Sequence, residues 1–161
     1  MSSCDIVKSK NLICQETFKF EHESKDVKIG TPFGRFAIVD GNAKIVPLKC
    51  CILDCPEGKN LQVDVEFIVK ENLTISELGE PDIPLEYVFR IVERFKFKDC
   101  KINDTSNLKC EVVCILGEND IKLNSDKNTL TQKIKACLEI KVIKEKKLIF
   151  DLSCPRFPSD C

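Results

Sequence analysis

The stretch that decides the fold runs from Leu61 to Lys70 and reads Leu-Gln-Val-Asp-Val-Glu-Phe-Ile-Val-Lys. Apolar residues occupy every second position from Leu61 to Val69, and most of the residues between them are polar. Side chains alternate between the two faces of a β-strand, so this period of two predicts a strand with one face buried and one in solvent. An amphipathic helix would instead place apolar residues three and four positions apart.

The same alternation recurs in residues 85–98 and 133–142. Polar segments such as Asp40-Gly41-Asn42 are predicted turns between shorter strand candidates. These shorter candidates are residues 11–20, 33–39, 43–53, 108–116 and 147–152.

The sequence therefore predicts an all-β fold, a single-domain antiparallel β-sandwich or barrel of about eight strands. A chain of 161 residues suits one domain of this kind. We expect the domain to span residues 11–152. Extended N- and C-terminal tails are predicted at residues 1–10 and 153–161, where the periodicity is lost.

The charge of the chain is balanced, with 25 Lys+Arg against 26 Asp+Glu. Binding to nucleic acid needs an excess of basic side chains, and no stretch approaches the roughly 18 apolar residues of a membrane-spanning helix. The N-terminal residues also lack the apolar segment of a secretory signal peptide. We therefore predict that neither nucleic acid nor a membrane is a partner, and that Sec-type export does not apply.

Catalytic chemistry has little support in the sequence. The single histidine, His22, lies in a polar stretch suited to a solvated turn. No carboxylate stands in an apolar context that would separate the pKa values of an acid–base pair, and no glycine-rich loop suited to phosphate is present. We predict that the chain is not an enzyme and that it needs no cofactor.

Cysteine is the unusual component of this chain, with eleven residues. Because the number is odd, pairing within one chain cannot use all of them. Zinc sites commonly use Cys-x2-Cys, whereas this chain offers Cys51-x3-Cys55 and Cys110-x3-Cys114, so a metal site stays open only as an alternative. Disulfides are the main prediction.

Strand parity sorts the cysteines into two groups. Cys110 and Cys114 share the apolar face of residues 108–116, and Cys14 shares a side with Phe18, so all three are predicted to be internal or buried. Cys50 and Cys51 are successive and point to opposite faces, so one of them faces outward. Residues with outward parity, at strand ends or in the tails are the candidates for intermolecular disulfides: Cys4, Cys50, Cys51, Cys55, Cys137, Cys154 and Cys161.

The alternating strands at 61–70 and 84–98, the entry Ile83-Pro84-Leu85, and the phrase Phe95-Lys96-Phe97-Lys98-Asp99-Cys100 resemble the SPOCS domain of spore coat assembly proteins. The resemblance covers about residues 10–145 and implies no catalytic residues. It implies a protein made in the mother cell without a signal peptide and exposed to oxidant once that cell lyses. The cysteine content departs from the usual pattern of the family.

These observations predict a structural protein that self-assembles into a disulfide-cross-linked layer or filament on the spore surface. Its expected partners are further copies of itself and other spore coat proteins. The alternative is an extracellular β-sandwich domain that binds a ligand or another protein and holds its disulfides within one chain. The sequons Asn72-Leu73-Thr74 and Asn103-Asp104-Thr105 fit that alternative.

Overall fold

The computed structural model describes residues 6–53, 58–102 and 105–149. Within these ranges the chain forms six antiparallel strands and no helix, so the prediction of an all-β fold is confirmed. The strands are β1 (Ile6–Lys28), β2 (Ile38–Ile52), β3 (Asn60–Ser76), β4 (Ile83–Lys101), β5 (Leu108–Asn124) and β6 (Thr129–Ile149).

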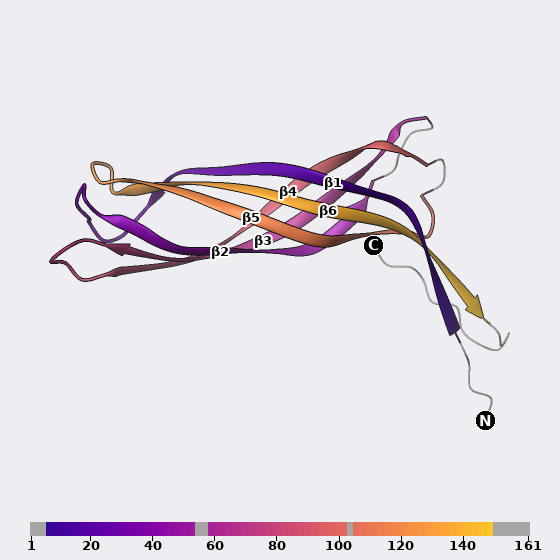
Figure 1. The fold of residues 1–161 in the computed structure, drawn as a ribbon, viewed down its shortest axis with the longest axis horizontal. Coiled ribbons are helices and arrows are strands. Elements are labelled where there is room, and N and C mark those ends of the chain that lie inside the picture. The colour runs from indigo at the N-terminus through magenta and orange to yellow at the C-terminus, as the bar shows by residue number, and fades with distance from the viewer. Residues whose placement is uncertain (1–5, 54–57, 103–104, 150–161) are drawn as a thin grey trace, which may run out of the picture.

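The strands pair in two three-stranded sheets, with the orders β1-β6-β5 and β2-β3-β4. All six run along the long axis of the molecule (Figure 1), and the longest has 23 residues. β6 and β3 are the central strands, whereas β1, β5, β2 and β4 are edge strands. β1 and β6, the first and last of the described strands, are therefore neighbours in one sheet, and the β2-β3-β4 meander forms the other.

The predicted number of eight strands is wrong, because two predicted breaks lie inside continuous strands. β2 passes straight through Asp40-Gly41-Asn42, which pairs residue for residue with Asn72–Thr74 of β3. β6 is also continuous from Thr129 to Ile149, so residues 147–149 are not a separate strand. The turn-forming residue types of Asp40-Gly41-Asn42 are tolerated in β2 because β3 supplies a partner for each of them.

Gly41 is needed at its position in β2 because its φ angle is 140° and a Cβ there would overlap the backbone carbonyl oxygen of Asn72. We expect Gly41→Ala to lower the free energy of unfolding by about 2 kcal/mol, measured by urea denaturation, since the backbone must shift to admit the methyl group. Gly30→Ala is the matched control, because a Cβ at Gly30 meets nothing within 4 Å. Equal midpoints for the two variants would refute this account of Gly41.

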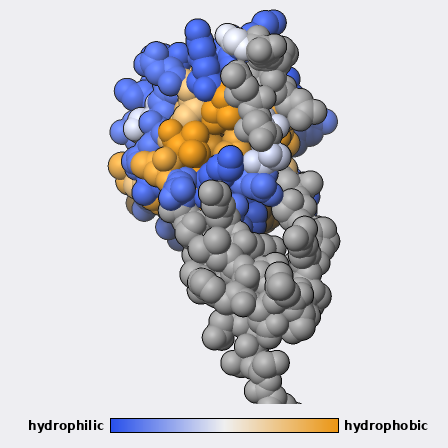
Figure 2. All heavy atoms as spheres, turned by 90° about the vertical axis from the view of Figure 1, so that its right-hand side faces the viewer, coloured by the Kyte–Doolittle hydropathy of each residue, from blue (hydrophilic) through white to orange (hydrophobic). Residues whose placement is uncertain are grey.

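The core lies between the two sheets and is made by the inward-facing rows of their central strands. Aromatic contacts cross from one sheet to the other: the rings of Phe20 and Phe67 lie 5.0 Å apart, and those of Phe18 and Phe95 lie 5.1 Å apart. Figure 2 views the molecule from one end, with apolar residues toward the centre and hydrophilic residues around them. The alternation that predicted these strands is explained by this burial, and the core residues below 2% exposure include Leu61, Val63, Val65, Phe67, Val69, Ile134, Leu138, Ile140 and Val142.

β1 and β6 continue past the rest of their sheet as a two-stranded ribbon (Figure 1). In this ribbon Ile6–Asn11 pairs with Lys144–Ile149, and the pairing of β5 with β6 begins only at Leu108 opposite Lys144. β1 therefore begins at Ile6, inside the tail predicted for residues 1–10. The predicted tail at residues 153–161 lies outside the described residues.

Candidate functional site

Among the residues that the structure describes, two disulfides join the two sheets, one along each side of the molecule. Cys14 of β1 is bonded to Cys100 of β4 with their Cα atoms 6.1 Å apart, and Cys50 of β2 is bonded to Cys110 of β5 with a Cα separation of 5.7 Å. All four belong to edge strands, where hydrogen-bonded pairing within each sheet stops. Each disulfide thus closes one of the two sides along which the sheets could part.

Both disulfides act at the same level of the β1-β6-β5 sheet. Val142 of β6 pairs with Cys14 on one side and with Cys110 on the other, so the three residues form one row across the sheet. Val142 itself is fully buried. This row lies near the end from which the two-stranded ribbon leaves, so the sheets are covalently joined toward that end of the molecule.

Cys14 and Cys110, predicted to be internal, are both part of these inter-sheet bonds. The prediction that Cys50 forms an intermolecular disulfide is wrong, because its partner is Cys110 of the same chain. β2 has a register shift between Pro47 and Lys49, after which Cys50 lies on the core side of the strand. The inward or outward choice between Cys50 and Cys51 could not be read from alternation alone.

Cys100 was assigned to neither group from the sequence, yet it is only 3% exposed. Its inward position depends on an irregularity in the ladder, where the pairing shifts between Asn60 and Gln62 of β3. The backbone N–H of Lys98, in the irregular stretch of β4, donates a hydrogen bond of 2.9 Å to Glu16 of β1. The alternation of Phe95 and Phe97 would have placed Cys100 on the outer face, so no local pattern indicated its role.

The prediction that Cys114 is buried is wrong, because the structure places its thiol on the exposed surface. A β-bulge between Val112 and Cys114 inserts Val113 as an extra residue and reverses the parity of everything that follows. Ile115 instead packs against the core. Cys114 is thereby turned to the outer face of the β1-β6-β5 sheet.

Cys137 lies on the same outer face as Cys114, is partly exposed and carries a free thiol. Cys51 is opposite the outward-facing Asp64 of β3, on the outer face of the other sheet. The remaining candidates for intermolecular disulfides, Cys4, Cys55, Cys154 and Cys161, lie outside the described residues. Among the described cysteines, therefore, two bonds face inward and two free thiols share one outer face.

A chain of four polar side chains crosses the interior between two apolar clusters. The Tyr87 hydroxyl donates to Gln132 Oε1 at 2.8 Å, Gln132 Nε2 donates to Asn119 Oδ1 at 3.0 Å, and Asn119 Nδ2 donates to Glu71 Oε2 at 3.2 Å. These residues come from β4, β6, β5 and β3, so the chain connects both sheets. Glu71 is 2% exposed, and its Oε1 has no hydrogen-bond partner among the described residues.

The expectation that no carboxylate stands in an apolar context is wrong for Glu71. Burial raises the pKa of Glu71 to about 7, although the hydrogen bond from Asn119 acts in the opposite direction. Burial, together with the charge of Glu71, also raises the pKa of Tyr87 above its usual range. The sequence did contain a sign that Glu71 is buried, because Glu71 has the same strand parity as the inward-facing Val69 and Leu73.

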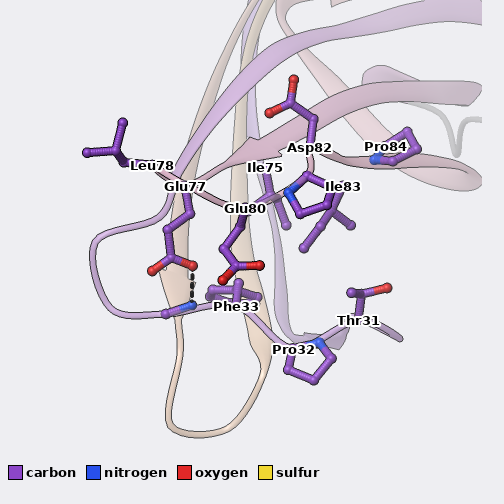
Figure 3. Close-up of a pocket in the computed structure, with 12 residues that line it drawn as sticks. Thr31, Pro32, Phe33, Ile75, Glu77, Leu78, Glu80, Asp82, Ile83 and Pro84 are labelled. Atoms are coloured by element: carbon purple, nitrogen blue, oxygen red, sulfur yellow. Dashed lines mark hydrogen bonds between the residues drawn. The ribbon is translucent and has the colours of Figure 1, made fainter.

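A hollow of about 720 Å³ opens at the opposite end of the molecule, between the β1–β2 connection and the β3–β4 turn. The backbone N–H of Gly34 donates to Glu77 Oε2 at 2.8 Å and ties the two segments together. Glu77 and Glu80 point toward the segment that carries Phe33, whereas Leu78 points away and is fully exposed (Figure 3). Sequence reasoning did not identify this hollow.

Within the ranges that the structure describes, no three His, Cys, Asp or Glu side chains converge as metal ligands. Those same ranges contain no helix with the length and apolar character of a membrane span. No protein-family model, curated protein or solved structure matches the chain.

Proposed function

We propose that this chain is a β-sandwich building block of a disulfide-cross-linked layer or filament on the surface of bacterial spores. It would act by binding further copies of itself, and other spore coat proteins, rather than by catalysing a reaction. The resemblance of residues 61–70 and 84–98 to the SPOCS domain supports the spore location. That location would also bring the thiols of the chain into contact with oxidant once the mother cell lyses.

The distribution of the cysteines is the observation that carries the proposal. Four of them lock the two sheets together from the inside, while Cys114 and Cys137 present free thiols on an outer face. A subunit of a durable assembly needs both properties, because it must keep its shape and also form bonds to its neighbours. Exposed free thiols are a disadvantage for a protein that works as a monomer.

The test compares the purified full chain in air with the same chain under reductant, by electron microscopy and by denaturing gels run without reductant. We expect ordered filaments or layers and a ladder of covalent oligomers in air, and their loss under reductant. Protein alkylated in its native state before exposure to air is the matched control. Its inter-sheet disulfides stay intact while its accessible thiols are blocked, so it should not become cross-linked.

The second candidate function is a binding domain, and the hollow lined by Phe33, Glu77 and Glu80 is the observation that favours it. The two disulfides within one chain are compatible with this function as well. A monodisperse monomer in air, with or without alkylation, would exclude the assembly and leave binding at the hollow as the better account.

A further inference from the structure

The hollow between the β1–β2 connection and the β3–β4 turn is acidic and has an apolar floor. Its lining contains three carboxylates, those of Glu77, Glu80 and Asp82, and no lysine, arginine or histidine. Ile75 is buried beneath it, and Phe33 is half-buried against the same apolar cluster. The volume of about 720 Å³ lies within the range of ligand sites, roughly 300–1,000 Å³. A positive charge beside an apolar group fits this combination of lining residues.

The walls of the hollow are held in place without a ligand. The backbone N–H of Gly34 donates to Glu77 Oε2 across the hollow (Figure 3), and the backbone N–H of Glu80 donates to the carbonyl oxygen of Glu77 at 3.1 Å. Within the described ranges, neither Glu77 nor Glu80 forms an ion pair with a lysine or an arginine. A ligand would therefore find a preformed site whose negative charge is not neutralised.

One segment outside the described residues has the matching chemistry. All the residues outside the described ranges together contain a single basic side chain, that of Arg156. It stands in the sequence Pro155-Arg156-Phe157-Pro158, next to an aromatic residue and between two prolines. Because proline fixes its φ angle, such a segment loses less conformational entropy on binding than other sequences do. Segments of the form Pro-x-x-Pro bind in aromatic-lined grooves of several domains.

Arg156 cannot reach the hollow of its own chain. Thr129, the first residue of β6, pairs with Lys28, and Thr31 of the hollow follows three residues later. From there β6 runs for 21 residues to Ile149, a length of roughly 65 Å. Arg156 comes seven residues after Ile149, and seven extended residues span at most roughly 25 Å. A hollow that holds this segment must therefore belong to another copy of the chain.

We propose that residues 155–158 of one copy bind in the hollow of the next copy. Arg156 pairs with Glu80 there, and Phe157 covers the apolar floor. The inference rests on the proposed function, because it names a contact through which the copies join. The segment follows the ribbon at one end of the molecule and the hollow lies at the other end (Figure 1). A contact between opposite ends of an elongated molecule extends as an open filament, so the proposal favours a filament over a layer.

A fluorescent peptide tests the contact directly. The peptide has the sequence of residues 153–159 with serine in place of Cys154, and the protein is the full chain with Arg156→Ala/Phe157→Ala, so that its own segment does not compete. We expect saturable binding by fluorescence anisotropy. Adding Glu80→Lys to this protein should weaken binding at least ten-fold. Glu118→Lys, the same change of charge at an exposed position of β5, is the matched control and should bind as before.

Charge reversal in the full chain tests whether the assembly uses this contact. Arg156→Glu and Glu80→Lys each place like charges together, so each should slow assembly in air several-fold, measured by light scattering. The double variant Glu80→Lys/Arg156→Glu restores an attractive pair with its signs exchanged. It should therefore assemble faster than either single variant, and Glu118→Lys should assemble at the natural rate.

Two kinds of failure are distinguishable. The inference would be overturned, while the proposed function would stand, if filaments or layers formed but the peptide did not bind saturably, or bound no better than a peptide of the same composition in scrambled order. Equal assembly rates for Glu80→Lys and Glu118→Lys would have the same meaning. A chain that stayed monomeric in every variant, at concentrations where the peptide binds, would overturn the proposed function and the inference together.

Discussion

The double variant Cys14→Ala/Cys100→Ala is expected to unfold with about 4 kcal/mol less free energy than the natural chain under non-reducing conditions. The cross-link joins residues 86 positions apart, and a bond that closes so long a loop removes much of the conformational freedom of the unfolded chain. It also closes the side between β1 and β4, where no hydrogen-bonded ladder holds the sheets together. Urea denaturation followed by circular dichroism measures the change.

The matched control for this prediction is Cys114→Ala, which removes an exposed thiol and should change stability by less than about 0.5 kcal/mol. Reductant should shift the midpoint of the natural chain toward that of the double variant and beyond it, because the Cys50–Cys110 bond is lost as well. If the double variant matched the natural chain in air, the Cys14–Cys100 bond could not be a stabilising link between the sheets.

Glu71 should make the stability of the protein fall as the pH rises from about 4.5 to about 7. In this window the folded chain keeps the proton on Glu71, because burial raises its pKa to about 7. The unfolded chain has already released it, so folding binds a proton and weakens as protons become scarce. The difference between the two pKa values corresponds to roughly 3 kcal/mol, which is present below pH 4.5 and lost above pH 7.

Glu71→Gln removes the charge while keeping the shape of the side chain and an oxygen that can accept from Asn119. The variant should therefore show a flatter pH dependence and exceed the natural chain at pH 8 by up to about 3 kcal/mol. Urea midpoints at several pH values between 5 and 8 give the comparison. Glu66→Gln is the matched control and should keep the natural slope, because Glu66 lies partly exposed on the outer face of the same strand, where it pairs with Arg90. If the stability of Glu71→Gln changed with pH as steeply as that of the natural chain, Glu71 could not be the group whose proton causes the pH dependence.

The sequence predicted the parts of the fold that depend on one buried face. Residues 61–69 and 134–142 alternate because every second side chain packs against the facing sheet. This requirement for an apolar residue at every second position can be recognised within the segment itself. The extent of the strands was less predictable, since Asp40-Gly41-Asn42 has the composition of a turn and is held extended by its pairing with β3. Whether such a segment turns or stays extended depends on the strand that it pairs with, which is distant in sequence.

The cysteines were predictable only where the ladder is regular. Cys137 lies in a regular part of β6, and Cys14 shares the parity of Phe18 and Phe20 because the ladder is regular on its C-terminal side, beyond a register shift between Leu12 and Cys14. The bulge at Val113, by contrast, reverses the side on which Cys114 lies. The pairing of Cys14 with Cys100 depends on β1 and β4 being edge strands that face one another, which is a property of the whole topology. Glu71 was missed because a charged residue at an inward position reads locally as the end of a buried strand.

The row formed by Cys14, Val142 and Cys110 has a mechanical consequence. Force that separates the two ends of the chain would open the β1–β6 ribbon one pair at a time, starting at Ile6 and Ile149, because the strands are antiparallel. Opening would stop at Cys14, which is covalently held by the other sheet, and β6 would there have to leave two neighbouring strands and the core at once. Under load the β1–β6 ribbon would therefore unpair while the disulfide-bonded pair of sheets stays folded. The ends of the chain could then move apart without unfolding the core.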